Sequence, residues 1–190
     1  MKIIVAICVY NRFENIKRWI DCWKKSNTQN AELIIIHNHY GDQCLSNEFY
    51  CYCGDHGIKY VERNGPGFDI GVFQDVCRSR LIGFPNLPKD WDYLLWCTDD
   101  ILPMSKDFIT PFIEKIQQPG VGISCMQLSN SISPHVRTSG FCISKEVASK
   151  IIFPVDPVTT KQHCYFWEHR GGQKTFTYQV RSMGLDCVQV

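Results

Sequence analysis

An excess of charge of either sign is absent from this sequence. Lysine and arginine together number 20 and aspartate and glutamate 19, so the formal net charge of the 190 residues is +1. A chain with balanced charge has no general electrostatic attraction for nucleic acid or for an anionic membrane surface. Any phosphate that this protein binds must therefore be held by a local site.

Long apolar runs are missing as well. The run over residues 3–9 is too short to cross a membrane and is followed by no small-residue cleavage site, so it predicts a first strand and not a signal peptide. No repeat or low-complexity segment divides the chain. We expect one domain over residues 1–190, and because residues 185–190 resemble a strand more than a tail, that domain can be the N-terminal part of a longer protein.

The spacing Cys-X-X-Cys is a third absence, although the chain has eleven cysteines. A zinc site built from Cys44, Cys51 and Cys53 is an alternative, but their spacing suits zinc poorly. Cysteines inside apolar runs are typical of buried free thiols in a reducing compartment, which predicts a cytoplasmic protein. Five cysteines lie in such runs: Cys8, Cys97, Cys125, Cys142 and Cys187.

What the sequence does contain is an alternation of strand and helix patterns. Continuous apolar runs predict strands buried on both faces, and apolar residues at helical spacing predict the helices between them. This alternation favours an α/β sandwich with a mostly parallel central sheet. Strands are expected over residues 3–9, 31–37, 58–61, 93–97, 121–128, 140–143 and 185–190, and helices over residues 14–25, 72–81, 105–116, 144–152 and 175–183, with a weak helix within residues 38–57.

Polar residues follow several of these strands. Tyr10, Asn11 and Arg12 follow the first, His37 and Asn38 the second, and a glycine-rich turn over residues 64–71 the third. In parallel sheets, ligands bind beyond the carboxyl ends of the strands, so we expect these groups to form one site.

Two adjacent carboxylates, Asp99 and Asp100, end the strand over residues 93–97. Buried carboxylates are costly unless a cation or a donor compensates them, and a divalent metal that carries phosphate oxygens would do so. The alternative is a helix N-cap, where acidic residues are also favoured.

The order of these motifs resembles the nucleotide-sugar glycosyltransferases of the GT-A fold, family 2 in particular. The resemblance rests on Tyr10 and Asn11, on His37 and Asn38, and on Thr98 followed by the two aspartates. It implies a Rossmann-like α/β/α sandwich in a single domain. The dinucleotide fingerprint Gly-X-Gly-X-X-Gly is absent after the first strand, which disfavours an oxidoreductase.

The resemblance also implies roles for individual residues. Asp100 would hold Mn²⁺ or Mg²⁺, Asp99 the ribose, and Arg63 and Asp69 a phosphate or the donor sugar. The remaining nucleotide-sugar residues would be Ile7, Val9, Tyr10 and Asn11 around the base, His37 and Asn38 at its edge, and Thr98 beside the aspartates. Each has a simpler alternative: Tyr10 as a core aromatic, Arg63 and Asp69 as a surface ion pair, and His37 as a loop histidine with satisfied hydrogen bonds.

Inverting relatives place the catalytic base in an acidic pair before the last helix. Gly172 and Gln173 occupy those positions here and cannot serve. Glu168 is the nearest carboxylate and our candidate base, with Asp156 in reserve; the alternative is that Glu168 pairs with His169 or Arg170. The implied acceptor side consists of Gly140, Phe141 and Trp167.

The expected function is therefore metal-dependent transfer of a hexosyl group from a nucleoside diphosphate sugar to a glycan hydroxyl, with UDP as the expected nucleotide and inversion as the expected outcome. A non-catalytic module that binds sugar nucleotides or glycans is the alternative, because the acidic pair is missing. A nucleotidyltransferase would require a basic glycine-rich loop after the first strand, which Tyr10, Asn11 and Arg12 do not provide.

Overall fold

A computed structural model describes residues 1–39, 46–78, 90–155 and 160–190. Strands and helices alternate along most of it, as the apolar patterns predict. The elements are β1 Ile3–Val9, α1 Phe13–Lys24, β2 Glu32–His39, α2 Ser46–Asp55, β3 Lys59–Asn64, α3 Phe68–Arg78, β4 Tyr93–Thr98, α4 Ile109–Ile116, β5 Val121–Cys125, β6 Leu128–Ser129, β7 His135–Val136, β8 Gly140–Ser144, α5 Lys145–Lys150, α6 Lys161–Tyr165, the π-helix η1 Phe166–Arg170, the 3-10 helix η2 Gly172–Lys174, α7 Phe176–Ser182 and β9 Asp186–Gln189.

Seven strands form one sheet in the order β3-β2-β1-β4-β8-β5-β9. β8 runs antiparallel to both β4 and β5, and the other neighbouring strands are parallel. The expected α/β sandwich with a mostly parallel central sheet is therefore confirmed.

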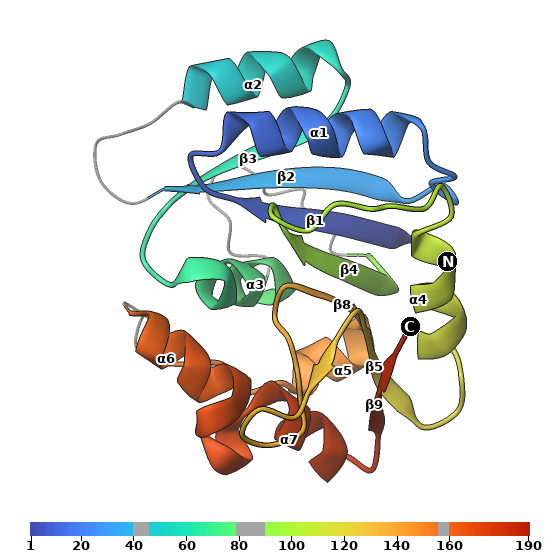
Figure 1. The fold of residues 1–190 in the computed structure, drawn as a ribbon, viewed down its shortest axis with the longest axis vertical. Helices are drawn as coiled ribbons and strands as arrows, with labels where there is room; N and C mark the ends of the chain where they lie inside the picture. The colour runs from blue at the N-terminus through green and yellow to red at the C-terminus, as the bar shows by residue number, and fades with distance from the viewer. Residues whose placement is uncertain (40–45, 79–89, 156–159) are drawn as a thin grey trace.

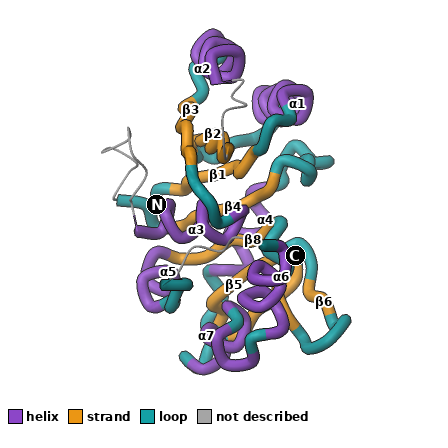
Figure 2. Tube along the Cα trace, turned by 90° about the vertical axis from the view of Figure 1, so that its left-hand side faces the viewer, coloured by secondary structure: helices purple, strands orange, loops and turns teal. Residues whose placement is uncertain are grey.

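The two faces of the sheet bury separate apolar clusters, because successive side chains of a strand point to opposite faces. Ile7 and Val9 of β1 pack with residues of α1, α2 and α4, whereas Ala6 and Cys8 pack with residues of α3, α5 and α7. α1 and α2 accordingly lie together at one end of the molecule and α5, α6 and α7 at the other (Figures 1 and 2).

Several predicted boundaries need correction. β3 continues through Asn64, so Arg63 lies in the strand and not in the glycine turn. α3 begins at Phe68, four residues before the predicted start, and the rest of its predicted range, from residue 79, lies outside the described residues. α4 begins at Ile109, because Ser105 accepts a hydrogen bond from the backbone N–H of Asp107 in a preceding turn.

Two helix starts agree with the predicted helix ranges. The side chains of Ser144 and Thr175 accept hydrogen bonds from the backbone N–H groups of Val147 and Tyr178 at the starts of α5 and α7. No helix within the described residues has the length and apolar character that a membrane crossing would need.

The ten cysteines in the described part of the chain are free thiols, six of them buried, as their apolar surroundings predict. Cys53 is buried in α2 whereas Cys51 is exposed, and Cys44 lies outside the described residues. These two described positions give no support to the alternative of a zinc site there.

Candidate functional site

A pocket with a volume of about 260 Å³ opens beyond the carboxyl ends of β1 and β4. Five separate segments build its wall: the residues after β1, the end of β4 with the two residues that follow it, the start of α3, the segment before β8, and the run from α6 into η1. The lining residues are Tyr10, Arg12, Phe68, Asp69, Thr98, Asp99, Asp100, Arg137, Thr138, Ser139, Lys161, Cys164, Tyr165 and Glu168.

The two adjacent aspartates have different surroundings. Asp99 is only 2% exposed, and its carboxylate accepts a hydrogen bond from Asn15 Nδ2 at 3.1 Å and lies 3.5 Å from Arg12 Nη1. Burial raises the pKa of Asp99, and Asn15 and Arg12 partly oppose this effect. Asp100 is exposed and accepts a hydrogen bond from Thr98 Oγ1 at 2.5 Å.

The surroundings of Asp100 fit the divalent cation that the fold family implies. Protein donors face the carboxylate of Asp99, whereas Asp100 is exposed to the pocket. Mg²⁺ is typically held by one or two carboxylates together with substrate phosphates, and an exposed carboxylate at a pocket rim meets that requirement.

Tyr10 lies on the pocket wall, and it packs against the same apolar cluster as Cys8. Burial raises the pKa of the Tyr10 hydroxyl, so the phenol stays neutral. Ile7 and Val9 point to the opposite face of the sheet, where both side chains are fully buried. Their side chains cannot surround a nucleotide base as expected, because strand alternation places them away from the pocket.

His37 is a core residue and not an open base-edge group. Its ring stacks on Phe49 at a centroid distance of 4.3 Å, and its two nitrogens lie 2.8 Å from Tyr60 Oη and 2.8 Å from Asn11 Oδ1. Burial, together with the nearby His39, lowers the pKa of His37 to about 4. Because Asn11 and Tyr60 occupy both ring nitrogens, neither nitrogen is open to a ligand, and this corrects the expectation for His37. The role expected for Asn11, which is exposed, stays a prediction.

Arg63 and Asn38 hold the glycine turn and do not line the pocket. The guanidinium of Arg63 donates to Asn38 Oδ1 at 2.7 Å, to the carbonyl oxygens of Gly65 and Pro66, and to Asp75 Oδ2 at 2.8 Å. The expected contacts of Arg63 with phosphate and of Asn38 with a base are therefore replaced by internal ones. Gly67 in this turn has φ +122°, a conformation that glycine adopts without strain.

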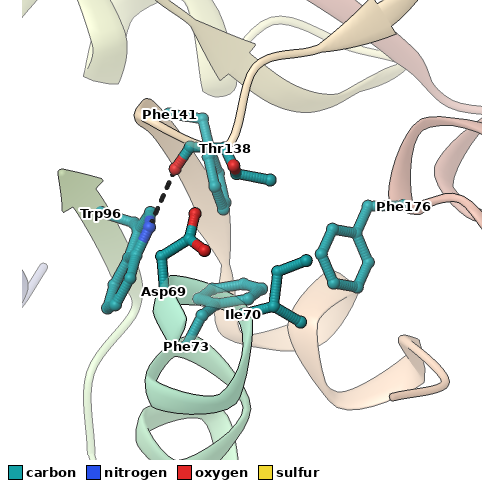
Figure 3. A pocket seen from close by; sticks show the side chains of 7 residues that line it. All are labelled: Asp69, Ile70, Phe73, Trp96, Thr138, Phe141 and Phe176. Atoms are coloured by element: carbon teal, nitrogen blue, oxygen red, sulfur yellow. Dashed lines mark hydrogen bonds between the residues drawn. The ribbon is translucent and has the colours of Figure 1, made fainter. Parts of the chain in front are cut away.

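Asp69 reaches the pocket from the first turn of α3. Asp69 also lines a small neighbouring pocket, where Figure 3 shows its carboxylate between Trp96 and Thr138, above the apolar side chains of Ile70 and Phe73. Burial raises the pKa of Asp69, a hydrogen bond with Thr138 partly opposes this, and the negative charge of Glu168 adds to it. Asp69 and Arg63 form no ion pair with each other, since Arg63 pairs with Asp75.

Glu168 lies on the pocket wall beside Thr138 and is 5% exposed. Its Oε1 accepts a hydrogen bond from the backbone N–H of Thr138 at 3.1 Å and lies 3.4 Å from Arg137 Nε, while Oε2 lies 3.3 Å from His169 Nδ1. The π-helix η1 presents it, and the hydrogen bond from Gly171 N to Phe166 O at 2.7 Å closes that wide turn. The reserve candidate, Asp156, lies outside the described residues.

None of the residues expected on the acceptor side lines the pocket of about 260 Å³, although Phe141 lines the small neighbouring pocket of Figure 3. Phe141 is buried in the core against Phe73, at a centroid distance of 5.1 Å, and Gly140 pairs with Cys97 in the sheet. Trp167 of η1 packs toward Phe176 at the start of α7. Thr138 and Ser139, just before β8, occupy the wall instead, because the chain leaves the sheet there.

Three cationic side chains lie on the wall: Arg12, Arg137 and Lys161. Arg12 belongs to the polar group predicted after the first strand, whereas Arg137 and Lys161 were not predicted as site residues. Arg137 and Lys161 come from segments without apolar periodicity, and no local pattern indicates where such segments fold. Together these side chains give the pocket positive charge beside its carboxylates.

Solved structures share this fold at low sequence identity. The mannosyltransferase PcManGT from Pyrobaculum calidifontis, in complex with GDP-Man and Mn²⁺, aligns with a TM-score of 0.68 at 12% identity, over 99% of this chain and 54% of its own. TarS 1-349 from S. aureus, in complex with UDP-GlcNAc, aligns with a TM-score of 0.54 at 13% identity, over 81% of this chain and 49% of its own. The fold is that of the GT-A glycosyltransferases.

The likeness establishes the fold and not the reaction. A 4-diphosphocytidyl-2C-methyl-D-erythritol synthase from Anaerococcus prevotii aligns as well, with a TM-score of 0.55 at 8% identity, over 99% of this chain and 87% of its own. No protein-family model matches the sequence, and no curated protein matches it either. The chain spans about half the length of the two glycosyltransferase structures.

Proposed function

We propose that this protein transfers a hexosyl group from a UDP sugar to a hydroxyl of a glycan acceptor, with Mn²⁺ or Mg²⁺ as cofactor. The observation that carries the proposal is the composition of the pocket. Asp99 and Asp100 lie on one wall, Glu168 lies on another, and three cationic side chains line the same pocket. Separate acidic groups with cations between them suit a reaction in which a diphosphate leaves and a hydroxyl loses its proton.

The donor is assigned to the side of the pocket formed by β1 and β4. Tyr10 would stack on the base. Asp99, together with the neighbouring Thr98 at the end of β4, would contact the ribose. Asp69, at the start of α3, would contact the donor sugar. Arg12, Arg137 and Lys161 would neutralise the diphosphate. Asp100 would hold the cation, which supplies Lewis-acid stabilisation of the negative charge on the leaving group when it is bound.

Glu168 is assigned as the catalytic base. Its Oε1 would take the proton of the acceptor hydroxyl while the acceptor oxygen forms a bond to the anomeric carbon of the donor. The bond between that carbon and the diphosphate oxygen breaks in the same step, and the nucleoside diphosphate leaves. Attack from the side opposite the leaving group inverts the anomeric centre.

The identity of the nucleotide is part of the proposal. One similar structure contains UDP-GlcNAc and another GDP-Man, which supports a nucleoside diphosphate sugar as the donor class. We assign uridine, and a thermal-shift screen of UDP and GDP sugars with and without Mn²⁺ tests this choice, because a ligand that binds the native state raises the melting temperature. Stabilisation by GDP sugars alone would show that the nucleotide is guanosine and not uridine.

The free thiols support a reducing compartment, such as the cytoplasm, as the place where the protein acts.

The deciding experiment measures release of the nucleoside diphosphate from the donor that the screen selects. Asp100→Ala should abolish the Mn²⁺ dependence, and Glu168→Gln should reduce turnover by at least 100-fold while donor binding persists. Glu114→Gln, on the exposed side of α4, is the matched control and should behave as the wild type.

Two outcomes would change the assignment. Donor binding without turnover under any condition would favour the rival function, a non-catalytic module that binds sugar nucleotides. Unchanged turnover in Glu168→Gln would show that Glu168 is not the catalytic base, and Asp156→Asn would then be the next variant to measure.

A further inference from the structure

Behind the wall that carries Glu168, two histidines complete a buried cluster. His135, Glu168 and His169 are 1%, 5% and 8% exposed, and each offers a ligand atom within 4.8 Å of the other two. The histidines come from different segments, β7 and η1, and neither lines the pocket. The fold therefore brings together two imidazoles and one carboxylate that the proposed transfer reaction does not use as a group.

His135 has a nitrogen available for a ligand. Its Nδ1 lies 2.7 Å from the carbonyl oxygen of Ser133, so Nδ1 carries the hydrogen and Nε2 carries the lone pair. Nε2 is buried and has no hydrogen-bond partner among the described residues. A buried acceptor without a partner is unfavourable, so a group that binds Nε2 would relieve this cost.

The hydrogen bond at Nδ1 matches what metal-binding histidines need. Such a histidine almost always donates its second ring N–H to a carbonyl or a carboxylate, which fixes the tautomer and the ring orientation. A second contact holds the same segment in place, because the backbone N–H of Val136 donates to Thr177 Oγ1 of α7 at 2.8 Å. His135 is thus oriented before any ligand arrives.

The other two groups are held equally closely. Glu168 and His169 are neighbours in the π-helix, where Oε2 of the glutamate lies 3.3 Å from Nδ1 of the histidine. The His135 and His169 rings lie 4.7 Å apart between centroids, and Ser133 Oγ donates to the carbonyl oxygen of His169 at 3.3 Å. Both segments of the cluster are therefore connected to each other directly.

We propose that His135, Glu168 and His169 form a binding site for a transition-metal cation, with Zn²⁺ as the ion that fits best. Imidazole suits zinc, whereas Mg²⁺ and Mn²⁺ are suited by carboxylate, carbonyl and water oxygens, so this site differs in preference from Asp100. Two histidines and one glutamate are a known zinc ligand set that leaves a fourth position open. Around a tetrahedral zinc ion with bonds of about 2.0–2.2 Å, two ligand atoms lie roughly 3.4 Å apart. Small side-chain rotations would bring the three ligand atoms from their present separations to that distance.

The site and the assigned base can share one carboxylate. Oε1 of Glu168 faces Thr138 and Arg137, which line the pocket, whereas Oε2 faces His169. The cation would bind Oε2 and leave Oε1 at the pocket. Metal binding can nevertheless be measured independently of the proposed transfer reaction, because the three ligands are present whatever the pocket binds.

Zinc binding to the purified chain, measured without any nucleotide sugar, tests the proposal. After chelator treatment, the protein is dialysed against Zn²⁺ and the bound metal is counted for the wild type, His135→Ala, His135→Asn and Glu168→Gln. We expect the wild type to bind one zinc per chain more than each of these variants. His163→Ala removes an exposed histidine and Asp100→Ala removes the other proposed cation ligand, and both should bind as the wild type does.

Because the chain has eleven cysteines, the ligand type must be read separately. Substituting Co²⁺ should give a spectrum without the near-ultraviolet charge-transfer band of thiolate ligation, and this spectrum should be lost in His135→Asn. Circular dichroism of the metal-free variants establishes that they are folded. Equal zinc binding by the wild type and the folded His135 variants, or loss of the zinc in Asp100→Ala, would overturn the proposal. Failure of sugar transfer alone would not.

Discussion

The guanidinium of Arg63 lies 2.8 Å from the carboxylate of Asp75, two turns into α3, and this ion pair is largely shielded from solvent. The remaining donors of Arg63 bind Asn38 and two carbonyl oxygens of the glycine turn. One side chain therefore fixes the end of β3, the turn after it and the start of α3. Asp69 owes its position at the pocket to this arrangement.

Arg63→Lys should destabilise the protein without acting on the ligand directly. A lysine keeps the positive charge but cannot make the contacts with Asn38, Asp75 and the two carbonyl oxygens at the same time, so we expect a loss of about 2–4 kcal/mol in the free energy of unfolding. Urea denaturation measures this loss, with Arg18→Lys on the exposed side of α1 as the control. An unchanged stability combined with weakened nucleotide binding would restore the phosphate role first expected for Arg63.

His37 should make the stability depend on pH in the acidic range. Burial lowers the pKa of His37 to about 4 from its ordinary 6.5, so the unfolded chain takes up a proton before the folded one does. This contribution to the free energy of unfolding is complete above pH 6.5 and is lost as the pH falls to 4. The loss amounts to about 3 kcal/mol, because each pH unit between the two pKa values corresponds to about 1.36 kcal/mol.

The measurement is the free energy of unfolding of the wild type, His37→Gln and His163→Gln at several pH values between 7 and 4. His37→Gln should lack this part of the loss, and His163→Gln should keep it because residue 163 is exposed. Parallel pH profiles for the wild type and His37→Gln would show that His37 is not the group responsible.

Asp69→Asn should change stability in the opposite sense. Burial raises the pKa of Asp69, so the wild type is favoured with this carboxyl protonated and loses that advantage as the pH rises through the raised pKa. At neutral pH the neutral amide should be at least as stable as the carboxylate. Because the His37 effect raises the stability of both proteins between pH 4 and pH 7, the melting temperature of the variant should rise more over that range than that of the wild type.

Turnover with the selected donor should fall in Asp69→Asn, because the substitution replaces a carboxylate oxygen that is assigned to the donor sugar. Asp107→Asn, an exposed carboxylate before α4, is the matched control for both measurements. A lower melting temperature in Asp69→Asn at neutral pH would contradict the assigned cost of its burial.

Gly171→Ala should disturb the base assigned to Glu168. A Cβ at position 171 would lie 2.5 Å from the carbonyl oxygen of Phe166, the acceptor that closes the π-helix, so that turn must shift. A displacement of about 1 Å at a catalytic group can reduce turnover on the order of 100-fold, and we expect a loss of that size.

Gly54→Ala is the glycine control, because a Cβ there meets no atom within 4 Å and helix α2 should gain up to about 1 kcal/mol. Stability and donor binding are measured beside turnover, so that a local shift can be separated from unfolding. Wild-type turnover in a folded Gly171→Ala would contradict the need for this π-helical turn.

The sequence alone determined the class of fold. Apolar runs such as residues 3–9 bury both faces of a strand, and that requirement is local, so the α/β alternation can be deduced without a structure. It also placed Tyr10, Asp99 and Asp100 beyond strand ends, because the carboxyl ends of parallel strands share one edge of the sheet.

Only the tertiary structure decided which face of that edge carries the pocket. Alternation puts Tyr10 on the side of α3 and puts Ile7, Val9 and His37 on the side of α1 and α2, but neither side is marked in the sequence as the binding side. Arg137 and Glu168 meet from segments thirty residues apart, through a loop and a π-helix without periodic patterns. The paired aspartates were therefore identified from their place at a strand end, whereas their neighbours depend on long-range packing that no local pattern records.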